Sequence, residues 1–272
     1  MIERWFVTGD CHREFSRFKN YPDSINNDKT AIIILGDAGI NYMLDEHDSQ
    51  IKNYLTKRFN FHIYCVRGNH EARPQDVENM ILEYDENVQG EVYYQKKWPR
   101  IKYFKDWGLY TIGDYRVAVI GGAYSVDKEW RLYMKQKWFE NEQLSDDEML
   151  ECTADLMGQE VDFVFTHTCP ICWEPTDLFL GSVDQSKVDK SMELFLEEVA
   201  KVFRWKIWCF GHYHADRMER PYVEQYSKDT EELCMIAERW KKYKESNELD
   251  WWLVKSPNFY YDDPIEEGNY FD

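Results

Sequence analysis

Five apolar stretches of this chain each end in a short loop that carries aspartate, asparagine or histidine. In the clearest case Ile63-Tyr64-Cys65-Val66 leads into Gly68-Asn69-His70-Glu71. A glycine directly after an apolar run predicts a strand that ends in a tight, polar turn. The same pattern ends four further predicted strands, at residues 4–8, 30–35, 161–165 and 206–210.

Strands and helices alternate in the first quarter of the chain. Residues 30–35 are almost wholly apolar, as in a strand covered on both faces. Apolar residues near helical spacing predict a helix over 45–59, between this strand and the next. This order predicts an α/β fold, in which ligands bind beyond the carboxyl ends of the strands. Four short stretches then predict a partly antiparallel meander, at 91–94, 101–104, 109–112 and 116–120.

Sequence patterns in the second half of the chain predict three more helices and one main domain. Ser145 and Glu148 form a capping box that starts a helix running to about residue 157. Apolar faces predict further helices over 187–203 and 230–244. We therefore predict a core at 1–217 and a C-terminal appendage at 218–272, packed on the same domain.

The end of the predicted appendage is rich in aromatic and acidic residues. Trp251-Trp252-Leu253-Val254 predicts a strand or docking segment, and Asp262 to Asp272 forms an acidic, aromatic tail. We expect this tail to pack on the core, to cap the substrate or to bind a protein partner.

Composition narrows the cellular setting. The chain has 272 residues, of which 43% are hydrophobic, enough for a full core. It has no apolar run of about eighteen residues, and its first residues lack the pattern of a signal peptide. Seven cysteines, an odd number spread widely, do not form a disulfide framework. We expect a cytoplasmic protein with no membrane segment.

The formal net charge of −18 limits the partners. So acidic a surface repels long polyanions and disfavours binding to extended duplex nucleic acid. It does not exclude a small phosphate ester held by metal ions, because bound divalent cations dominate their local field.

The polar loops together predict a metal site. Five of the seven histidines fall in them, and only His47 and His62 do not. Asp10 and His12 are two residues apart, which in extended backbone places both side chains on one side. One such pair alone would be an ordinary turn, but convergent aspartates and histidines at five strand ends mark a metal site. The candidates are Asp10, His12, Asp37, Asn69, His70, His167, His212 and His214.

These loops resemble the five signature blocks of the calcineurin-like metallophosphoesterase superfamily. They occur in the family's order over residues 4 to about 217: Gly9-Asp10-Cys11-His12, Gly36-Asp37, Gly68-Asn69-His70-Glu71, Thr166-His167 and Gly211-His212-Tyr213-His214. The turn Gly121-Gly122-Ala123-Tyr124-Ser125 is similar to that of members from bacteria and their phages. The resemblance implies a two-sheet β-sandwich of mixed strands flanked by helices, a four-layer αββα fold.

The resemblance also implies a dinuclear site. By matching position, Asp10, His12 and His214 would hold one ion, Asn69, His167 and His212 the second, and Asp37 both. Such a pair of cations activates a bridging hydroxide and neutralises phosphoryl charge. The mixed ligands suit manganese first, with iron, zinc or magnesium as alternatives. His70 matches the catalytic histidine, which protonates the leaving oxygen or stabilises the transition state.

Departures from the family bear on the substrate. Where phosphoprotein phosphatases carry a further aspartate and an arginine after the Gly-Asp block, this chain has Ile40 and Asn41. The arginine that grips a protein-bound phosphate is missing, which disfavours a protein phosphatase. The partner that would orient His70 is not identified by the sequence. Candidate substrate contacts, for which an ordinary surface role is about equally expected, are Arg13, Asn41, Lys128 and Arg131.

Three functions are consistent with these residues. The first is a dinuclear-metal-dependent hydrolase of phosphomonoesters or phosphodiesters, with a small or nucleotide-like substrate and the bridging hydroxide as nucleophile. The second is a nuclease or nucleic-acid end-processing phosphoesterase, which the acidic surface disfavours. The third is a non-catalytic scaffold on the same fold, which ranks last because all eight matched positions are intact.

Overall fold

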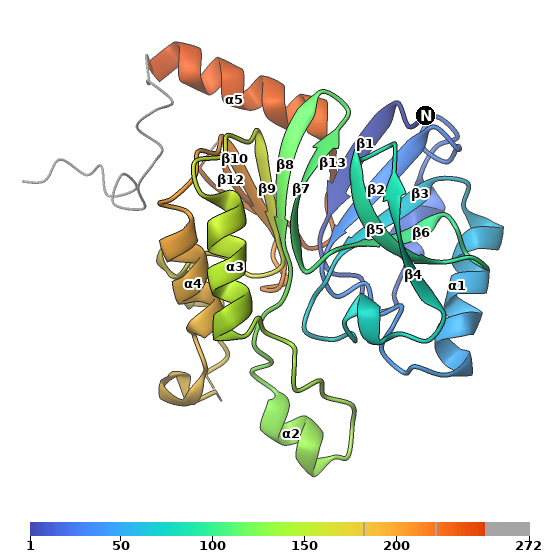
Figure 1. Ribbon diagram of the computed structural model, residues 1–272, viewed down its shortest axis with the longest axis horizontal. Helices are drawn as coiled ribbons and strands as arrows, with labels where there is room; N and C mark the ends of the chain where they lie inside the picture. Colours follow the sequence, from blue (N-terminus) through green and yellow to red (C-terminus); the bar gives the residue numbers. More distant parts are fainter. Residues whose placement is uncertain (182, 221, 248–272) are drawn as a thin grey trace, which may run out of the picture.

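Two β-sheets lie face to face, with helices on their outer sides (Figure 1). The computed structural model describes residues 1–181, 183–220 and 222–247. In the first sheet four neighbouring strands are parallel and the flanking strands are antiparallel. Its order is β13 (Thr230–Glu232), β1 (Arg4–Thr8), β2 (Thr30–Leu35), β3 (His62–Val66), β6 (Ile101–Phe104), β5 (Gly90–Gln95) and β4 (Met80–Asp85).

The second sheet repeats this design with a parallel centre and antiparallel edges. Its order is β11 (Arg217–Arg220), β12 (Val223–Gln225), β10 (Ile207–Phe210), β9 (Phe163–Thr166), β8 (Tyr115–Ile120) and β7 (Trp107–Ile112). The carboxyl ends of β1, β2 and β3 and those of β9 and β10 carry the five polar loops.

The helices complete the four layers. α1 (Glu46–Arg58) packs on the outer face of the first sheet, where Leu55 joins Ile32 and Ile34 of β2. α3 (Asp146–Leu156) and α4 (Ser191–Val199) cover the second sheet, and α5 (Leu233–Asn247) lies across one end of the sandwich (Figure 1). The predicted fold, two mixed sheets flanked by helices, is confirmed.

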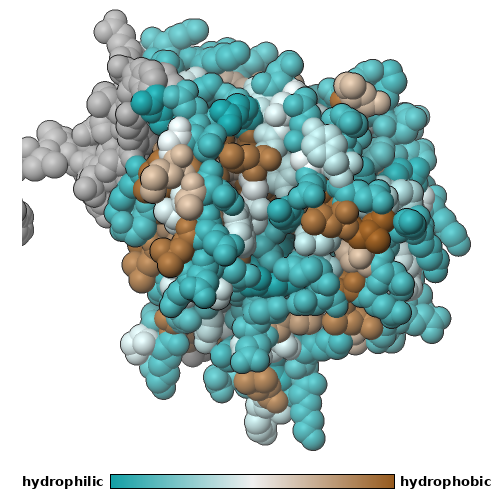
Figure 2. Space-filling view, in the orientation of Figure 1, coloured by the Kyte–Doolittle hydropathy of each residue, from teal (hydrophilic) through white to brown (hydrophobic). Residues whose placement is uncertain are grey.

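The segment around α2 (Lys128–Tyr133) projects from the carboxyl-end side of the sandwich (Figure 1). Its base is fixed to buried Arg67, whose carbonyl accepts from the Gly122 amide at 2.8 Å and whose Nη1 donates to the Glu142 carbonyl at 2.6 Å. The face in Figure 2 is mostly hydrophilic, with a separate hydrophobic patch over this projection. Trp130 and Tyr133 of α2 are exposed.

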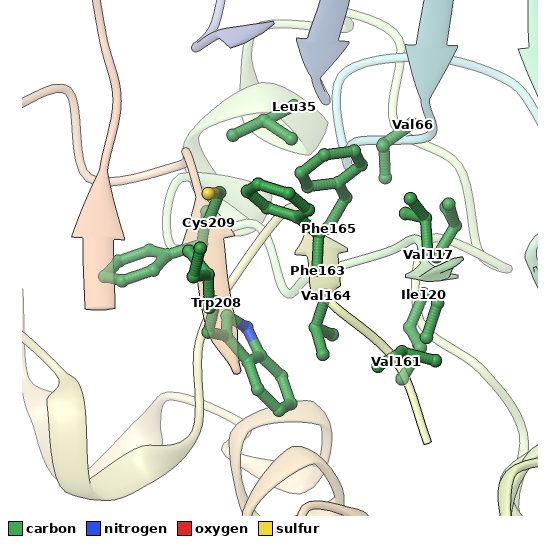
Figure 3. Close-up of a cluster of buried hydrophobic side chains, with 14 of the residues drawn as sticks. Leu35, Val66, Val117, Ile120, Val161, Phe163, Val164, Phe165, Trp208 and Cys209 are labelled. Carbon is green, nitrogen blue, oxygen red and sulfur yellow. The ribbon is translucent and has the colours of Figure 1, made fainter. Parts of the chain in front are cut away.

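The main core lies between the sheets. Leu35 and Val66 from the first sheet face Phe163 and Phe165 of the second (Figure 3). After Thr30, β2 is apolar because alternate side chains enter two cores: Ala31, Ile33 and Leu35 point inward, and Ile32 and Ile34 point toward α1. The rigid sandwich holds the strand ends, and so the polar loops, in fixed relative positions.

The helices differ from the prediction mainly at their ends. α1 and α3 lie within one residue of the predicted bounds, and the capping box between Ser145 and Glu148 is present. α4 is shorter than the predicted 187–203, because the Asp189 carboxylate accepts from the Ser191 amide and forms a turn before the helix. The strand β4 was not predicted, since residues 74–90 show little periodicity.

Residues after 217 contribute to both sheets. β12 pairs with β10, and β13 pairs with β1, where Thr230 lies opposite Thr8. Thr230–Glu232 is therefore strand and not the start of the predicted helix, which begins at Leu233; the backbone edge of β1 needs a hydrogen-bonding partner. The division at residue 217 stays a prediction, and Trp251 to Val254 and the tail lie outside the described residues.

Candidate metal centre

Side chains from all five loops meet at the carboxyl ends of the two sheets. Three groups of ligand-type atoms each lie within 4.8 Å of one another. They are Asp10, His12 and His214; His12, Asp37 and His70; and Asp10, Asp37 and His167. His212 lies beside this set, since its ring centroid is 4.9 Å from that of His167.

Each aspartate is held by the backbone of a distant loop. Oδ1 of Asp37 accepts from the His70 amide at 2.7 Å, and Oδ1 of Asp10 accepts from the His212 amide at 2.8 Å. Both carboxylates are buried. One oxygen of each is thus fixed by peptide groups, which leaves Oδ2 of each turned toward the centre.

The free oxygens face imidazole nitrogens from several loops. Oδ2 of Asp37 lies 3.5 Å from His167 Nε2, 3.7 Å from His12 Nε2 and 4.0 Å from His70 Nε2. Oδ2 of Asp10 is buried without a hydrogen-bond partner among the described residues, and lies 3.3 Å from His214 Nε2. Asp37 Oδ2 therefore lies within reach of imidazoles from three loops.

Asn69 and His167 face each other within the centre. His167 Nδ1 lies 2.8 Å from the Leu35 carbonyl, so Nδ1 carries a proton and Nε2 faces the centre. Nε2 lies 2.8 Å from Asn69 Oδ1, whose amide nitrogen donates to Ser125. When the ring is charged, Nε2 donates to the Asn69 oxygen; when Nε2 loses this proton, its lone pair and the Asn69 oxygen can bind the same metal ion.

Ser125 and Glu142 orient Asn69, and the sequence did not identify this role. The Asn69 amide donates to Ser125 Oγ at 2.8 Å, and Ser125 Oγ donates to Glu142 Oε2 at 2.5 Å. Glu142 Oε1 also accepts from the Ser125 amide at 2.9 Å. The Gly121–Ser125 turn was noticed from the sequence, but nothing local pairs Ser125 with a glutamate seventeen residues later.

The charges in the centre depend on one another. Burial alone would raise the pKa values of Asp10 and Asp37, but the positive charge of His167 holds both pKa values below their usual range. Burial alone would lower the pKa of His167, but Asp37 and Asp10 raise this pKa to about 9. Burial and the charge on His167 lower the pKa of His212 to about 3, which keeps its ring neutral and able to bind a metal.

Close backbone approach explains the glycines of the loops. A Cβ at Gly68 would lie 2.0 Å from Asp37 Oδ1, and a Cβ at Gly36 would lie 2.0 Å from His167 Nδ1. The paired ligands converge differently from our expectation: His12 and His214 have positive φ angles, 43° and 54°, and are not extended. Left-handed turns, and not strand alternation, bring each pair together.

The residues fit a site for divalent metal ions. Two buried carboxylates, four imidazoles and an amide oxygen converge, and Asp10 Oδ2 has no hydrogen-bond partner among the described residues and could bind a cation. Residues that would hold ions are Asp10, His12, Asp37, Asn69, His167, His212 and His214.

His70 lies at the edge of the centre and contacts Arg131. Its ring is partly exposed, with its centroid 4.9 Å from that of His12 and 6.5 Å from that of Tyr42. Arg131 Nη2 contacts the ring nitrogens, and Arg131 Nε donates to Asp127 at 2.9 Å. Burial and the guanidinium lower the pKa of His70. Arg131 is thus a neighbour that can orient His70, a partner that the sequence did not identify.

The other three candidate substrate contacts point elsewhere. Arg13 Nη1 donates to Asp48 at 2.8 Å, and Lys128 Nζ lies 4.1 Å from the centroid of the Trp138 ring. Asn41 is buried and lines a cavity of about 770 Å³ beside α1 that includes none of the seven predicted ligands. Of the four candidates, Arg131 is the one at the centre.

A smaller cavity, of about 400 Å³, opens directly on the predicted ligands. Its walls include Asp37, Asn69, His70, His212 and His214. The cavity beside α1 is larger, but this one is lined by predicted metal ligands and has the size of a small-molecule site.

Replacing Glu193 with glutamine is expected to stabilise the protein above pH 7. Glu193 is buried in the wall of this cavity, and burial raises its pKa to about 7 from 4.5. The unfolded carboxyl ionises first as pH rises, so the wild type loses stability from pH 4.5 through 7. Glutamine does not titrate, so Glu193→Gln should gain about 3 kcal/mol relative to the wild type at high pH.

Urea unfolding of both proteins at about pH 4.5 and at about pH 8 measures this difference. The variant keeps an acceptor for Thr168 Oγ1, which donates to Glu193 at 2.7 Å, so little change is expected at low pH. The same stability difference at both pH values would contradict the prediction.

Comparison with known proteins identifies similar chains. The family model for calcineurin-like phosphoesterases matches residues 4–216. No curated protein matches. Among solved structures, the sulfate thiohydrolase SoxB of Thermus thermophilus in complex with glycerol is similar at 10% identity and a TM-score of 0.34. That alignment covers 83% of this chain and 51% of SoxB.

Proposed function

This chain belongs to the calcineurin-like phosphoesterase family, and from that premise we propose that it is a dinuclear-metal-dependent hydrolase of phosphoester bonds. The proposed substrate is a small or nucleotide-like phosphomonoester or phosphodiester. Its support is the position of Asp37, whose Oδ2 lies within 4.0 Å of imidazoles from three different loops.

Each proposed ion has ligands from both sheets. Asp10, His12 and His214 would hold one, Asn69, His167 and His212 the other, and Asp37 both. When bound, the ions would neutralise charge on the phosphoryl oxygens and make water nucleophilic near neutral pH. Manganese is our first choice for imidazole, carboxylate and amide ligands together.

His70 and Arg131 would act on the substrate itself. When water attacks phosphorus and the ester P–O bond breaks, the leaving oxygen needs a proton, which His70 at the rim of the centre can donate. Arg131 is buried beside His70, and its Nη1 has no hydrogen-bond partner among the described residues. A phosphoryl oxygen is the acceptor that this group would take.

Replacing Arg131 with alanine is expected to raise KM by about 10- to 100-fold, the effect of one charge-assisted hydrogen bond. Metal content should not change, because the Arg131 side chain contacts Asp127 and His70, and neither is one of the seven predicted ligands. Steady-state kinetics and metal analysis of the same preparation measure both quantities.

Two variants test whether this effect is specific. Arg131→Lys keeps the charge but not the planar fork, so its KM should lie between those of the wild type and the alanine variant. Lys137→Ala removes an exposed charge from the same projecting segment and should leave KM unchanged. An equal rise in KM in Arg131→Ala and Lys137→Ala would mean that the effect comes from general electrostatics.

Turnover of chromogenic esters tests the proposed function. Metal-stripped protein is given manganese, zinc or magnesium in turn, with a p-nitrophenyl phosphomonoester and the matching diester. We expect metal-dependent turnover, with the preferred ester separating phosphatase from phosphodiesterase. A folded protein that binds ions and hydrolyses neither ester nor any alkyl phosphate would contradict the proposal and favour the scaffold.

We also propose a cytoplasmic setting. All seven cysteines are free thiols, and six of them are buried or half-buried. None of the helices in the described ranges has the length and apolarity to cross a membrane.

A further inference from the structure

The lining of the 400 Å³ cavity includes an apolar wall as well as predicted ligands. The wall combines the segment after β9 with the loop after β10. It consists of Leu178, Phe179, Leu180, Val183, Val188 and Tyr213. The rings of Phe179 and Tyr213 are nearly parallel, at 23° with centroids 6.4 Å apart. Such a wall, with Leu178 and Leu180 exposed, offers apolar and aromatic surface to the group that is attached to the phosphoryl unit.

The polar groups of the cavity do not favour a second anion. Lys190 Nζ pairs with Glu174 at 2.5 Å, and Arg131, which pairs with Asp127 through Nε, would bind the phosphoryl group through Nη1, so neither cation is available to a second anion. Asp189 and Glu193 add two more carboxyl groups to the lining. A leaving group with its own negative charge would meet unbalanced carboxylates in a partly dry site.

Glu193 provides a polar anchor within this wall. Its Oε1 accepts from Thr168 Oγ1, while Oε2 is buried and has no hydrogen-bond partner among the described residues. A buried carboxyl oxygen without a partner is costly, and a hydroxyl or amino group on a ligand would satisfy it.

We propose that the substrate is a phosphoester whose alcohol carries a flat apolar ring and no negative charge, with the ring against Phe179 and its neighbours. This inference rests on the proposed phosphoesterase function and names the substrate class for it. Two kinds of alcohol share this chemistry: nucleosides and aryl-substituted alcohols.

Matched pairs of esters test the class. We compare kcat/KM for 2-phenylethyl phosphate with that for ethyl phosphate, whose leaving alcohols have similar basicity. We also compare adenosine 5′-monophosphate with ribose 5-phosphate. At least one ring-bearing ester should be favoured by about 10- to 100-fold, as for the burial of one aromatic ring. A preference in the second pair alone identifies a nucleoside, and in the first alone an aryl alcohol.

Variants of the wall connect the preference to the cavity. Phe179→Ala and Leu178→Asp should each reduce the ring preference by about 5-fold or more, with metal content unchanged. Leu150→Asp is the matched control, because Leu150 is exposed on α3, outside the cavity lining. It should keep the wild-type preference.

The outcomes separate this inference from the proposed function. Metal-dependent hydrolysis with ratios near one in both pairs would overturn the ring-binding wall and leave the phosphoesterase intact. A ring preference that survives both wall variants would also overturn it. Failure to hydrolyse any of the four esters, or the chromogenic ones, counts against the phosphoesterase function itself.

Discussion

Replacing Asp37 with asparagine is expected to lower kcat/KM by about 10³-fold and to remove at least one bound ion. Asp37 Oδ2 is the oxygen that faces imidazoles on both sides of the centre. Asparagine keeps the acceptor for the His70 amide but removes the negative charge. Losing several kcal/mol of charge stabilisation corresponds to a rate effect of this size. Metal analysis and steady-state kinetics measure both effects.

The same variant has a predicted effect on stability. Without metal, the buried Asp37 carboxylate is paired with the charged His167 ring, so removing its charge should lower the melting temperature near neutral pH. With metal, the wild type should be the more stable protein, because ligands that bind only the folded state stabilise it. Asp28→Asn, at an exposed loop position, is the control. Wild-type rates in Asp37→Asn would falsify the two-ion proposal.

Replacing His70 with alanine is expected to lower kcat by about 10²- to 10⁴-fold while both ions remain bound. The His70 ring borders the centre, and the seven residues that we propose as ligands do not include it. The loss should be greatest for alkyl esters, whose leaving oxygen needs a proton, and smallest for p-nitrophenyl esters. Rates for a series of leaving groups, with metal content measured in parallel, test this prediction.

His47→Ala is the matched control for His70→Ala. His47 is exposed near the start of α1, where its ring contacts Asp45, and it belongs to none of the three groups of ligand-type atoms. A loss that is equal for good and poor leaving groups would mean that His70 does not protonate the leaving oxygen. Loss of metal in His70→Ala would instead make His70 a ligand.

Much of this fold can be predicted from local sequence. β2 and β3 are apolar on both faces because each lies between two cores, and this pattern is visible in the sequence. The loops meet because neighbouring parallel strands end at the same edge of a sheet. α3 has a complete capping box, so its start was predicted to the residue.

Other elements depend on contacts far along the chain. β4 exposes Leu82 and Tyr84 and is held mainly by pairing with β5, so its sequence has no buried face to reveal it. β13 is formed by polar residues that satisfy the edge of β1, more than two hundred residues earlier. The helical periodicity of residues 230–244 predicted a helix at the position of this short strand.

The metal centre, like the fold, has parts that local sequence predicts and parts that depend on distant contacts. Types and spacings of the predicted ligands could be identified from their loops. The support of Asn69 by Ser125 and Glu142, and the placement of Arg131 beside His70, depend on how the projecting segment folds back on Arg67. Side-chain contacts across such a segment follow no sequence periodicity, so they cannot be predicted from local sequence.

The hydrogen bonds that hold each aspartate to a distant loop have a consequence for biosynthesis. Asp10 is held by the amide of His212, and each proposed ion takes ligands from both ends of the chain. A ribosome-bound chain that lacks β10 therefore has neither set of ligands complete. Activity should appear in one step, after the last loop has left the exit tunnel and docked, and fragments that end before His212 should be inert.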